Sequence, residues 1–244
     1  MPDRPPTVVA LDAATDDVVV GALAGGKLLY EAVIGRGQRR FPRHAEMLLA
    51  EVERAAEAAG GWERVDRIGI GIGPGSYTGL RIGVATGRAL AQALALKAVP
   101  VGTLEALAAG ISASASGERP CLAVLDARRD EVFAQLHDPG ARLLSAPVVL
   151  APSRLGEWLT EISAKAHAKP AGVPLAGGSG ALRFVRELEV AGVEVLPGGD
   201  PAHSLAPQRI CDLALAAEPA RLEAIQPVYL REPDAKRWLD RDRS

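Results

Sequence analysis

The residues best placed to do chemistry near the start of the chain are an acid and a hydroxyl, Asp12 and Thr15. They lie at the turn of a predicted β-hairpin, where backbone N–H groups and a hydroxyl can bind a phosphate or its metal ion. Such a turn needs small residues that leave those N–H groups open. The turn also has Ala13 and Ala14, so Asp12 and Thr15 are its only polar candidates.

A second acid-led turn follows at Asp126, where the sequence reads Asp-Ala-Arg-Arg-Asp-Glu. Arg128 and Arg129 are bulky enough to crowd a nucleotide, although their charge could meet another anion. We therefore keep Asp12, Thr15 and Arg128 as candidates for binding a nucleotide or another anion. Both turns are interpreted as mainly structural.

The glycine-rich stretch Gly73 to Thr78 partly matches three enzyme motifs, but it lacks at least one required residue of each. A phosphate-binding P-loop needs a lysine, and none follows until Lys97. A dinucleotide fingerprint has its third glycine replaced by Ser76, and a nucleophile elbow around that serine meets Pro74 and Thr78 instead of glycines. We predict no catalytic residue here.

Metal-binding chemistry is not indicated either. The four histidines are scattered singly, at positions 44, 137, 167 and 203. No pair has helical spacing, and there is no Cys-x-x-Cys, so we predict no metal site. Cys121 and Cys211 are far apart, which favours two buried thiols over a disulfide.

Composition limits the partners and the compartment. The 244 residues are 48% apolar and have a net charge of −2, so the surface as a whole does not attract polyanions. Any contact with nucleic acid must be local or shared with a partner protein. No apolar run approaches the roughly 20 residues that cross a bilayer, and Met1 to Pro6 lacks a signal-peptide core, so we expect a cytoplasmic protein without a membrane anchor.

Several elements must position these residues. Alternation predicts strands at Thr7–Asp12, Val18–Leu23 and Val65–Ile72. Amphipathic spacing predicts a helix over His44–Ala59, and the glycine-rich turn feeds a second helix over Gly79–Leu96.

The same order of elements then occurs again. Residues 11–18 align without a gap on residues 125–132, with five of eight positions identical. A strand, a glycine-rich turn and a predicted helix over Ala181–Val190 echo the first strand-turn-helix unit more weakly. This resembles the duplicated two-lobe α/β architecture of actin, sugar kinases and Hsp70. We expect a first lobe over 1–103 and a second over 104–205, with 206–244 as a candidate to pack back on the first.

One stretch has a specific resemblance. Residues 73–85, Gly-Pro-Gly-Ser-Tyr-Thr-Gly-Leu-Arg-Ile-Gly-Val-Ala, closely resemble the signature GPGSFTGLRIG of the TsaB (YeaZ) family, with Tyr77 in place of phenylalanine. Segments 11–15, 44–49, 126–133 and 227–231 fall in the same order as in that family. The turn at Ala13 and Ala14 departs from its usual small hydroxyl residues.

The resemblance implies an actin-like protein without catalysis of its own. It would pair with the catalytic paralogue TsaD, with the ATPase TsaE joining, to transfer a threonylcarbamoyl group to the adenosine beside the anticodon of tRNA. ATP and metal are then expected on TsaD and TsaE, tRNA is met only through the complex, and the chain needs no cofactor. TsaD has a His-x-x-x-His metal pair on a helix. His44 stands alone in this chain, which therefore has no equivalent of that pair. The family also has a glycoprotease label, but this sequence has no recognisable set of protease catalytic residues.

A ridge of small residues on the second predicted helix is the main clue to a partner. Every fourth position from Gly79 to Ala95 is glycine or alanine, and Gly83 and Gly87 each cost about 1 kcal/mol of helix stability. Close approach of another element would offset that cost. The ridge could face the chain's own sheet or first helix, or another protein, and the family resemblance favours a four-helix arrangement with TsaD.

The candidate partner interface combines both helices and could also support a homodimer when the partner is absent. Its members are His44, Met47, Leu48, Glu51, Tyr77, Thr78, Gly79, Arg81, Ile82, Gly83, Thr86 and Gly87. The rival hypothesis is an actin-like ATPase or small-molecule kinase that uses Asp12 and Thr15.

Overall fold

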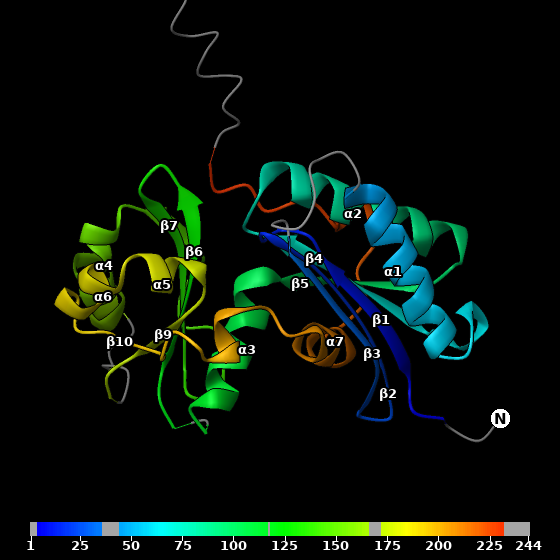
Figure 1. The fold of residues 1–244 in the computed structure, drawn as a ribbon, viewed down its shortest axis with the longest axis horizontal. Coiled ribbons are helices and arrows are strands. Elements are labelled where there is room, and N and C mark those ends of the chain that lie inside the picture. Colours follow the sequence, from blue (N-terminus) through cyan, green and yellow to red (C-terminus); the bar gives the residue numbers. More distant parts are fainter. Residues whose placement is uncertain (1–3, 36–43, 117, 166–171, 232–244) are drawn as a thin grey trace, which may run out of the picture.

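The computed structural model describes residues 4–35, 44–116, 118–165 and 172–231, and it has two α/β lobes side by side (Figure 1). Each lobe is built on one five-stranded sheet. The first sheet consists of β1 (Thr7–Asp12), β2 (Asp17–Ala24), β3 (Lys27–Gly35), β4 (Arg67–Gly73) and β5 (Lys97–Gly102). The second consists of β6 (Cys121–Arg128), β7 (Glu131–His137), β8 (Val148–Leu150), β9 (Leu175–Gly177) and β10 (Glu194–Val195).

The two sheets have the same topology. The strand order is β3-β2-β1-β4-β5 in one and β8-β7-β6-β9-β10 in the other. In each, the first three strands of the lobe are antiparallel and the last two run parallel to its first strand. The predicted duplicated two-lobe fold is therefore confirmed.

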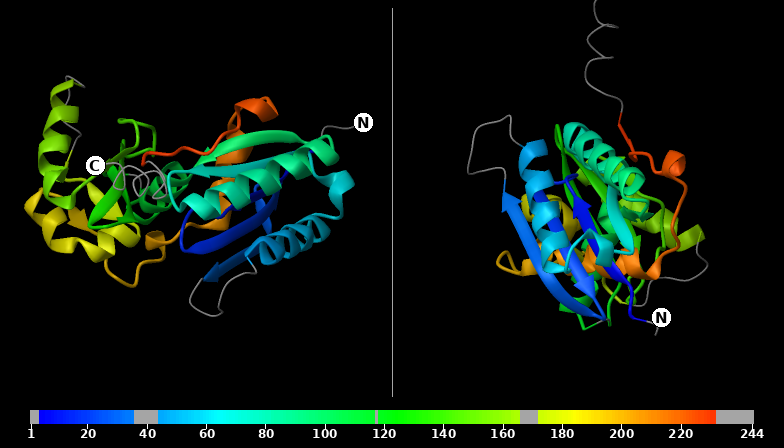
Figure 2. Two further views of the ribbon diagram at one scale, coloured as in Figure 1. Left: turned by 90° about the horizontal axis from the view of Figure 1, so that it is seen from above. Right: turned by 90° about the vertical axis from the view of Figure 1, so that its right-hand side faces the viewer.

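Helices cover both faces of each sheet (Figures 1 and 2). The described helices are α1 (His44–Ala58), α2 (Tyr77–Ala93), α3 (Thr103–Ser114), α4 (Leu155–Lys165), α5 (Ser179–Arg183), α6 (Val185–Val190) and α7 (Pro207–Ala216). α1 and α2 lie on one face of the first sheet and α7 on the other. α3 covers one face of the second sheet, and α4 to α6 cover the opposite face. None of these helices is long and apolar enough to span a bilayer.

The central strand β1 explains why this layering is stable. Val9 and Leu11 pack toward α1 and α2, whereas Val8 and Ala10 pack toward α7, and all four are fully buried. Strands buried on both faces read as continuous apolar runs. The sequence therefore places Asp12, at the end of such a run, deep between the layers.

The lobes are joined through α3 and the segment before α7. Leu104, Leu107 and Ile111 of α3 belong to the core of the second lobe, while Ala106 packs with the first. Residues 207–216 return to the first sheet as α7, and residues 232–244 lie outside the described part of the chain.

Three features of the structure differ from what the sequence led us to expect. The helix predicted over 79–96 spans Tyr77–Ala93, and Ala95 beyond its end is exposed and has a positive φ of 53°. The edge strand β3 was not predicted, because its apolar residues Leu28, Leu29 and Tyr30 are contiguous and hide the alternation. The prediction of one continuous helix over 181–190 is wrong. α5 ends at Arg183 and α6 starts at Val185, because Phe184 leaves helical geometry (φ −119°, ψ 43°) and buries its ring in the core.

Candidate functional site

The glycine-rich stretch of the signature fixes the start of α2 against the first hairpin. Ser76 caps the helix by accepting the Gly79 N–H at 3.4 Å, and its own N–H donates to the Ala14 carbonyl at 2.6 Å. A Cβ on Gly75 would lie 2.2 Å from that carbonyl oxygen. Only glycine permits this approach, so the motif has a packing role at this point.

The small-residue ridge packs on the chain's own sheet from Gly79 to Ala91, whereas Ala95 lies beyond the end of α2 and is exposed. Gly79, Gly83 and Gly87 are buried. A Cβ on Gly83 would meet Ala13 at 3.4 Å, and one on Gly87 would meet Ile70 at 2.7 Å. This settles the choice left open by the sequence: the glycines bring α2 close to β1 and β4.

Four candidate interface residues are therefore corrected. Leu48 is fully buried in the core of the first lobe, and Gly79, Gly83 and Gly87 face inward beneath α2. None of them has surface to offer another protein. Helical periodicity predicted one face for them, and that face proves to be the inner one.

Other candidates lie on the outer side of the same helices. Tyr77, Thr78 and Arg81 are exposed on α2, whereas Ile82 and Thr86 are half-buried. On α1, Met47 and Glu51 are half-buried, and His44 begins the helix with its side chain outside the described residues. Glu51 accepts hydrogen bonds from Tyr30 and Arg54, so its carboxylate is held by the lobe itself.

Two exposed residues on this face were missed by the sequence analysis. Leu49 of α1 is 49% exposed, directly after the buried Leu48, and Ala85 is exposed on α2 between the inward glycines. The sequence signal for Leu49 was its position directly after a core leucine, where the helical period turns an apolar side chain away from the centre of the buried face. The two helices lie side by side, so their outer residues form one surface (Figure 2).

An aromatic cluster ends this surface at the start of α2. The rings of Tyr77 and Tyr229 are 5.0 Å apart, and the Arg81 guanidinium lies 5.4 Å from the Tyr77 ring. Such contacts are favourable through ring quadrupole and cation–π attraction. Tyr229 comes from the end of the described chain, a neighbour that no local spacing in the sequence indicates.

A cleft of about 610 Å³ separates the lobes next to this cluster. It is lined by both hairpin turns, by the start of α2, by Ser179 and Leu182, by 203–205 and by 228–231. Its size suits a small ligand. The polar groups at its walls decide whether ligand chemistry is available.

Asp12 is engaged below the cleft. It is 1% exposed, and its carboxylate accepts the Ala14 N–H and the Thr103 hydroxyl, each at 2.6 Å. Burial raises its pKa, with both hydrogen bonds opposing the rise. Thr103 in turn accepts the Gly73 N–H at 3.1 Å. This carboxylate ties the hairpin to the start of α3 and does not line the cleft.

Thr15 lines the cleft but is bonded to its own turn. Its hydroxyl donates to the Asp17 carbonyl at 3.0 Å and accepts the Asp17 N–H at 3.3 Å. The structure thus brings Thr15 near Arg128 in one cleft but keeps Asp12 apart from them.

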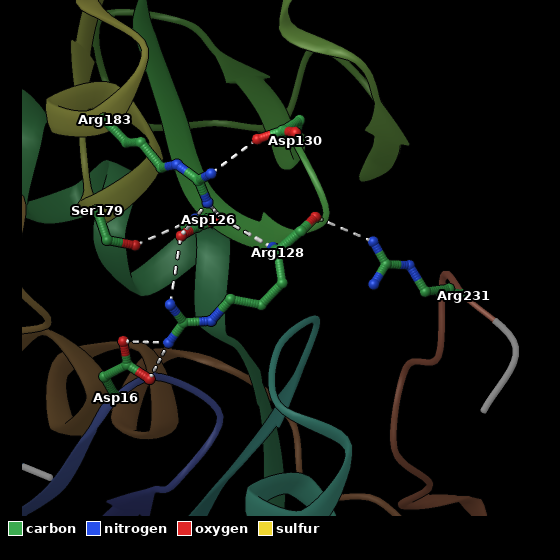
Figure 3. A network of polar contacts seen from close by, with 7 residues as sticks. All are labelled: Asp16, Asp126, Arg128, Asp130, Ser179, Arg183 and Arg231. Carbon is green, nitrogen blue, oxygen red and sulfur yellow. Dashed lines mark hydrogen bonds and ion pairs between the residues drawn. The ribbon is translucent and has the colours of Figure 1, made fainter. Parts of the chain in front are cut away.

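The second hairpin carries a network of ion pairs, one of which crosses the cleft to the first hairpin (Figure 3). Arg128 reaches the Asp16 carboxylate of the first hairpin at 2.7 and 2.8 Å. Arg183 binds both oxygens of Asp126, at 3.1 and 3.0 Å, and Asp130 at 2.7 Å. The cations that could have met an anionic ligand are therefore paired within the chain.

The turn that carries Arg128 is tightly folded. Arg128, Arg129 and Asp130 all have positive φ, between 53° and 63°. The Arg128 N–H donates to Asp126 at 2.8 Å, which supports the turn locally. This conformation is uncommon for residues other than glycine, so the surrounding contacts must hold it.

Histidines and cysteines have structural surroundings in the described part of the chain. His203 accepts the Gly178 N–H on Nδ1 at 3.2 Å, and its Nε2 lies 3.1 Å from the Leu196 carbonyl oxygen. Burial raises the pKa of Cys121 to about 11 and that of Cys211 to about 12, which keeps both as thiols. No three described His, Cys, Asp or Glu side chains gather as a metal site would require.

Comparisons with known proteins agree with this geometry. A family model described as "TsaD: tRNA N6-adenosine threonylcarbamoyltransferase" matches residues 41–188. An uncharacterized protein of Mycobacterium tuberculosis is 32% identical over 232 residues, 94% of each chain. The tRNA threonylcarbamoyladenosine biosynthesis protein TsaB of Bacillus subtilis is 29% identical over 177 residues, 72% of this chain and 74% of that one.

Solved structures give the same assignment of fold. YeaZ from Pseudomonas aeruginosa superposes with a TM-score of 0.71 at 29% identity, covering 92% of this chain and all of that one. A ROK hexokinase from Thermus thermophilus has a TM-score of 0.50 at 17% identity, covering 85% of this chain and 98% of that one, which shows a shared fold only.

Proposed function

The chain belongs to the TsaB/YeaZ family, and we propose that it acts in the biosynthesis of threonylcarbamoyladenosine in tRNA as a non-catalytic subunit. It binds and activates the catalytic paralogue TsaD, and the ATPase TsaE joins them. The reaction, ATP and metal belong to TsaD and TsaE, so this chain needs no cofactor. tRNA is met only through the complex, in the cytoplasm.

The observation that carries this proposal is the division of α2 into two faces. The signature stretch directs its glycines toward the sheet and leaves Tyr77, Thr78 and Arg81 exposed. Together with the exposed Leu49 of α1 they make a surface that includes an arginine and a tyrosine, two residue types enriched at binding hot spots. The same surface would pair two copies when TsaD is absent.

The polar groups in the cleft and directly below it support a role without catalysis. Asp12 is buried and accepts two hydrogen bonds, and Thr15 is bonded to its own turn. Arg128 is paired with Asp16. A phosphoryl-transfer site instead presents such groups to the nucleotide and its metal.

The decisive experiment changes the outer face and leaves the core intact. Arg81→Glu and Leu49→Asp should each weaken binding to TsaD by about tenfold or more, which is the usual effect at a hot spot. The matched control is Arg154→Glu, which reverses the charge of an exposed arginine on the second lobe.

Binding is measured by calorimetry, and threonylcarbamoyl transfer is measured in a reconstituted mixture of TsaD, TsaE and tRNA. If both variants bind and activate TsaD like the parent at an unchanged melting temperature, the outer face of α1 and α2 is not the partner surface. Loss of binding in the control variant would also count against it.

The rival function, an ATPase or small-molecule kinase, has its own test. The isolated chain is incubated with ATP, Mg²⁺ and a panel of acids and sugars, and ADP release is measured. Turnover that disappears in Thr15→Ala at an unchanged melting temperature would establish the rival and refute the non-catalytic role.

A further inference from the structure

The last described segment, residues 225–231, crosses from one lobe to the other and is called the strap below. It begins inside the first lobe, where Ile225 is fully buried in the core beneath α1 and α2. The Val228 N–H then donates to the carbonyl of Ile72, at the end of β4, at 2.8 Å. The strap is thus attached to the first lobe by packing and by a main-chain hydrogen bond.

Its other end is attached to the second lobe. Leu230 packs against the core that contains Phe133. Arg231 forms an ion pair with Glu131 and donates to the Arg128 carbonyl at 3.2 Å. Both contacts reach the β6–β7 hairpin, so this end holds the hairpin from outside.

Between these ends the strap meets the surface proposed for partner binding. The Tyr229 ring packs against the Tyr77 ring at the start of α2 in a tilted arrangement, with ring centroids 5.0 Å apart. Residues 228–231 also line the cleft between the lobes. The strap therefore touches α2, the cleft and the second hairpin within a few residues.

The other connections lie away from the strap. In Figure 1 the red strap runs along the top of the molecule, whereas α3 and the start of α7 join the lobes lower down. Lobes joined at one side only can rotate about that side as about a hinge. A contact at the opposite side limits this rotation most effectively, because it acts at the greatest distance from the hinge.

We propose that the strap is a brace that fixes the angle between the lobes and mechanically links the start of α2 to the β6–β7 hairpin. A protein that binds next to Tyr77 thereby influences the second lobe, whose hairpin it need not touch. The ion pair between Arg128 and Asp16 is a second tie across the same cleft. The role of the strap does not depend on which protein binds the first lobe.

The test measures the separation of the lobes in the full chain by pulsed electron paramagnetic resonance. Spin labels are attached at Glu57→Cys on α1 and Glu161→Cys on α4, which are exposed positions on different lobes. The native cysteines are buried and their pKa values lie at about 11 and about 12, so labelling at neutral pH is confined to the introduced thiols.

The variant Tyr229→Ala with Arg231→Ala removes the ring contact and the ion pair while keeping the buried Ile225 anchor. Partly exposed aromatic and ionic contacts of this kind together change an equilibrium by about tenfold, or about 1.4 kcal/mol. We expect the population with separated lobes to rise by that factor. The control Arg142→Ala breaks an exposed pair with Asp138 inside the second lobe and should leave the distance distribution unchanged.

Amide exchange at Val228 reports release of the strap itself, because its N–H bonds to Ile72. Faster exchange together with a broader distance distribution supports the brace. Faster exchange with the parental distribution would show that the lobes hold their angle without the strap and would overturn the proposal. Unchanged exchange in the double variant would overturn it too, since the two contacts would then not hold the strap.

Discussion

Gly83 and Gly87 offer a matched test of how α2 packs on its sheet. Both lie inside the same helix and on the same buried face. Replacing either with alanine therefore adds one Cβ and gives the same gain in helix propensity. That propensity is worth about 1 kcal/mol in favour of alanine. The two variants differ only in what the new methyl group meets.

The structure gives opposite surroundings for the two methyl groups. At Gly83 the added Cβ would lie 3.4 Å from the Ala13 Cβ, an ordinary van der Waals distance. At Gly87 it would lie 2.7 and 2.8 Å from two atoms of Ile70, which is fully buried and cannot move aside freely. Overpacking of this kind costs about 1–3 kcal/mol.

Gly83→Ala should therefore be as stable as the parent or up to about 1 kcal/mol more stable, and Gly87→Ala should be less stable than Gly83→Ala by about 1–3 kcal/mol. Urea titration of both variants and the parent measures these differences. In a chain of this size 1 kcal/mol corresponds to about 2–4 °C in melting temperature. Equal stabilisation of both variants would refute the packing of Gly87 on Ile70. Loss of binding to TsaD by Gly83→Ala at full stability would return this residue to the partner surface.

Three further predictions concern the two hairpin turns and the net charge of the chain. Replacing Arg128 and Arg129 with serine should leave the free energy of unfolding within about 1 kcal/mol of the parent, because the Arg128 pair is exposed; a larger loss in urea would mean that the network acts as a buried unit. Burial raises the folded-state pKa of Asp12 above its ordinary value of 3.8, so Asp12 favours folding below that value and loses this contribution as pH rises through its folded pKa. The stability of Asp12→Asn relative to the parent should accordingly increase with pH from about 4 upward, and a constant difference in a series of urea titrations would contradict the raised pKa. The isolated chain should bind tRNA no more tightly than about 10⁻⁴ to 10⁻⁶ M at physiological salt, and nanomolar binding in a gel shift without TsaD would overturn that expectation.

The duplicated fold could be predicted because its signal is local and occurs twice. Residues 11–18 and 125–132 each end one strand and begin the next, and the structure places both at the same point of the same topology. The turns themselves could not be predicted in shape. Arg128 to Asp130 adopt positive φ values, which these residue types disfavour. Residues of this turn also make long-range contacts with Arg183 and Asp16, which the local sequence does not indicate.

The site was harder to predict, because a helical period identifies a face and not what covers it. The glycine ridge was correctly assigned to one side of α2, yet only the structure places β1 and β4 beneath it. Leu48 and Leu49 are neighbours of one type, one in the core and one at the surface. The contacts of Tyr229 and Arg231 join residues about 150 and 100 positions apart, a separation at which no spacing rule operates.

The edges of the first sheet determine how the lobe can meet other chains through its backbone. Pro100 lies in the edge strand β5 and has no N–H to offer, and the Ala98 carbonyl of that strand already accepts the Ala220 N–H at 2.9 Å. β5 is therefore sealed against strand addition. At the opposite edge β3 places the charged Lys27 and Glu31 on its exposed side. Charged side chains on an edge strand disfavour pairing with a second copy, whereas Leu29 and Val33 on the same exposed side are apolar, so this edge is less well protected than β5.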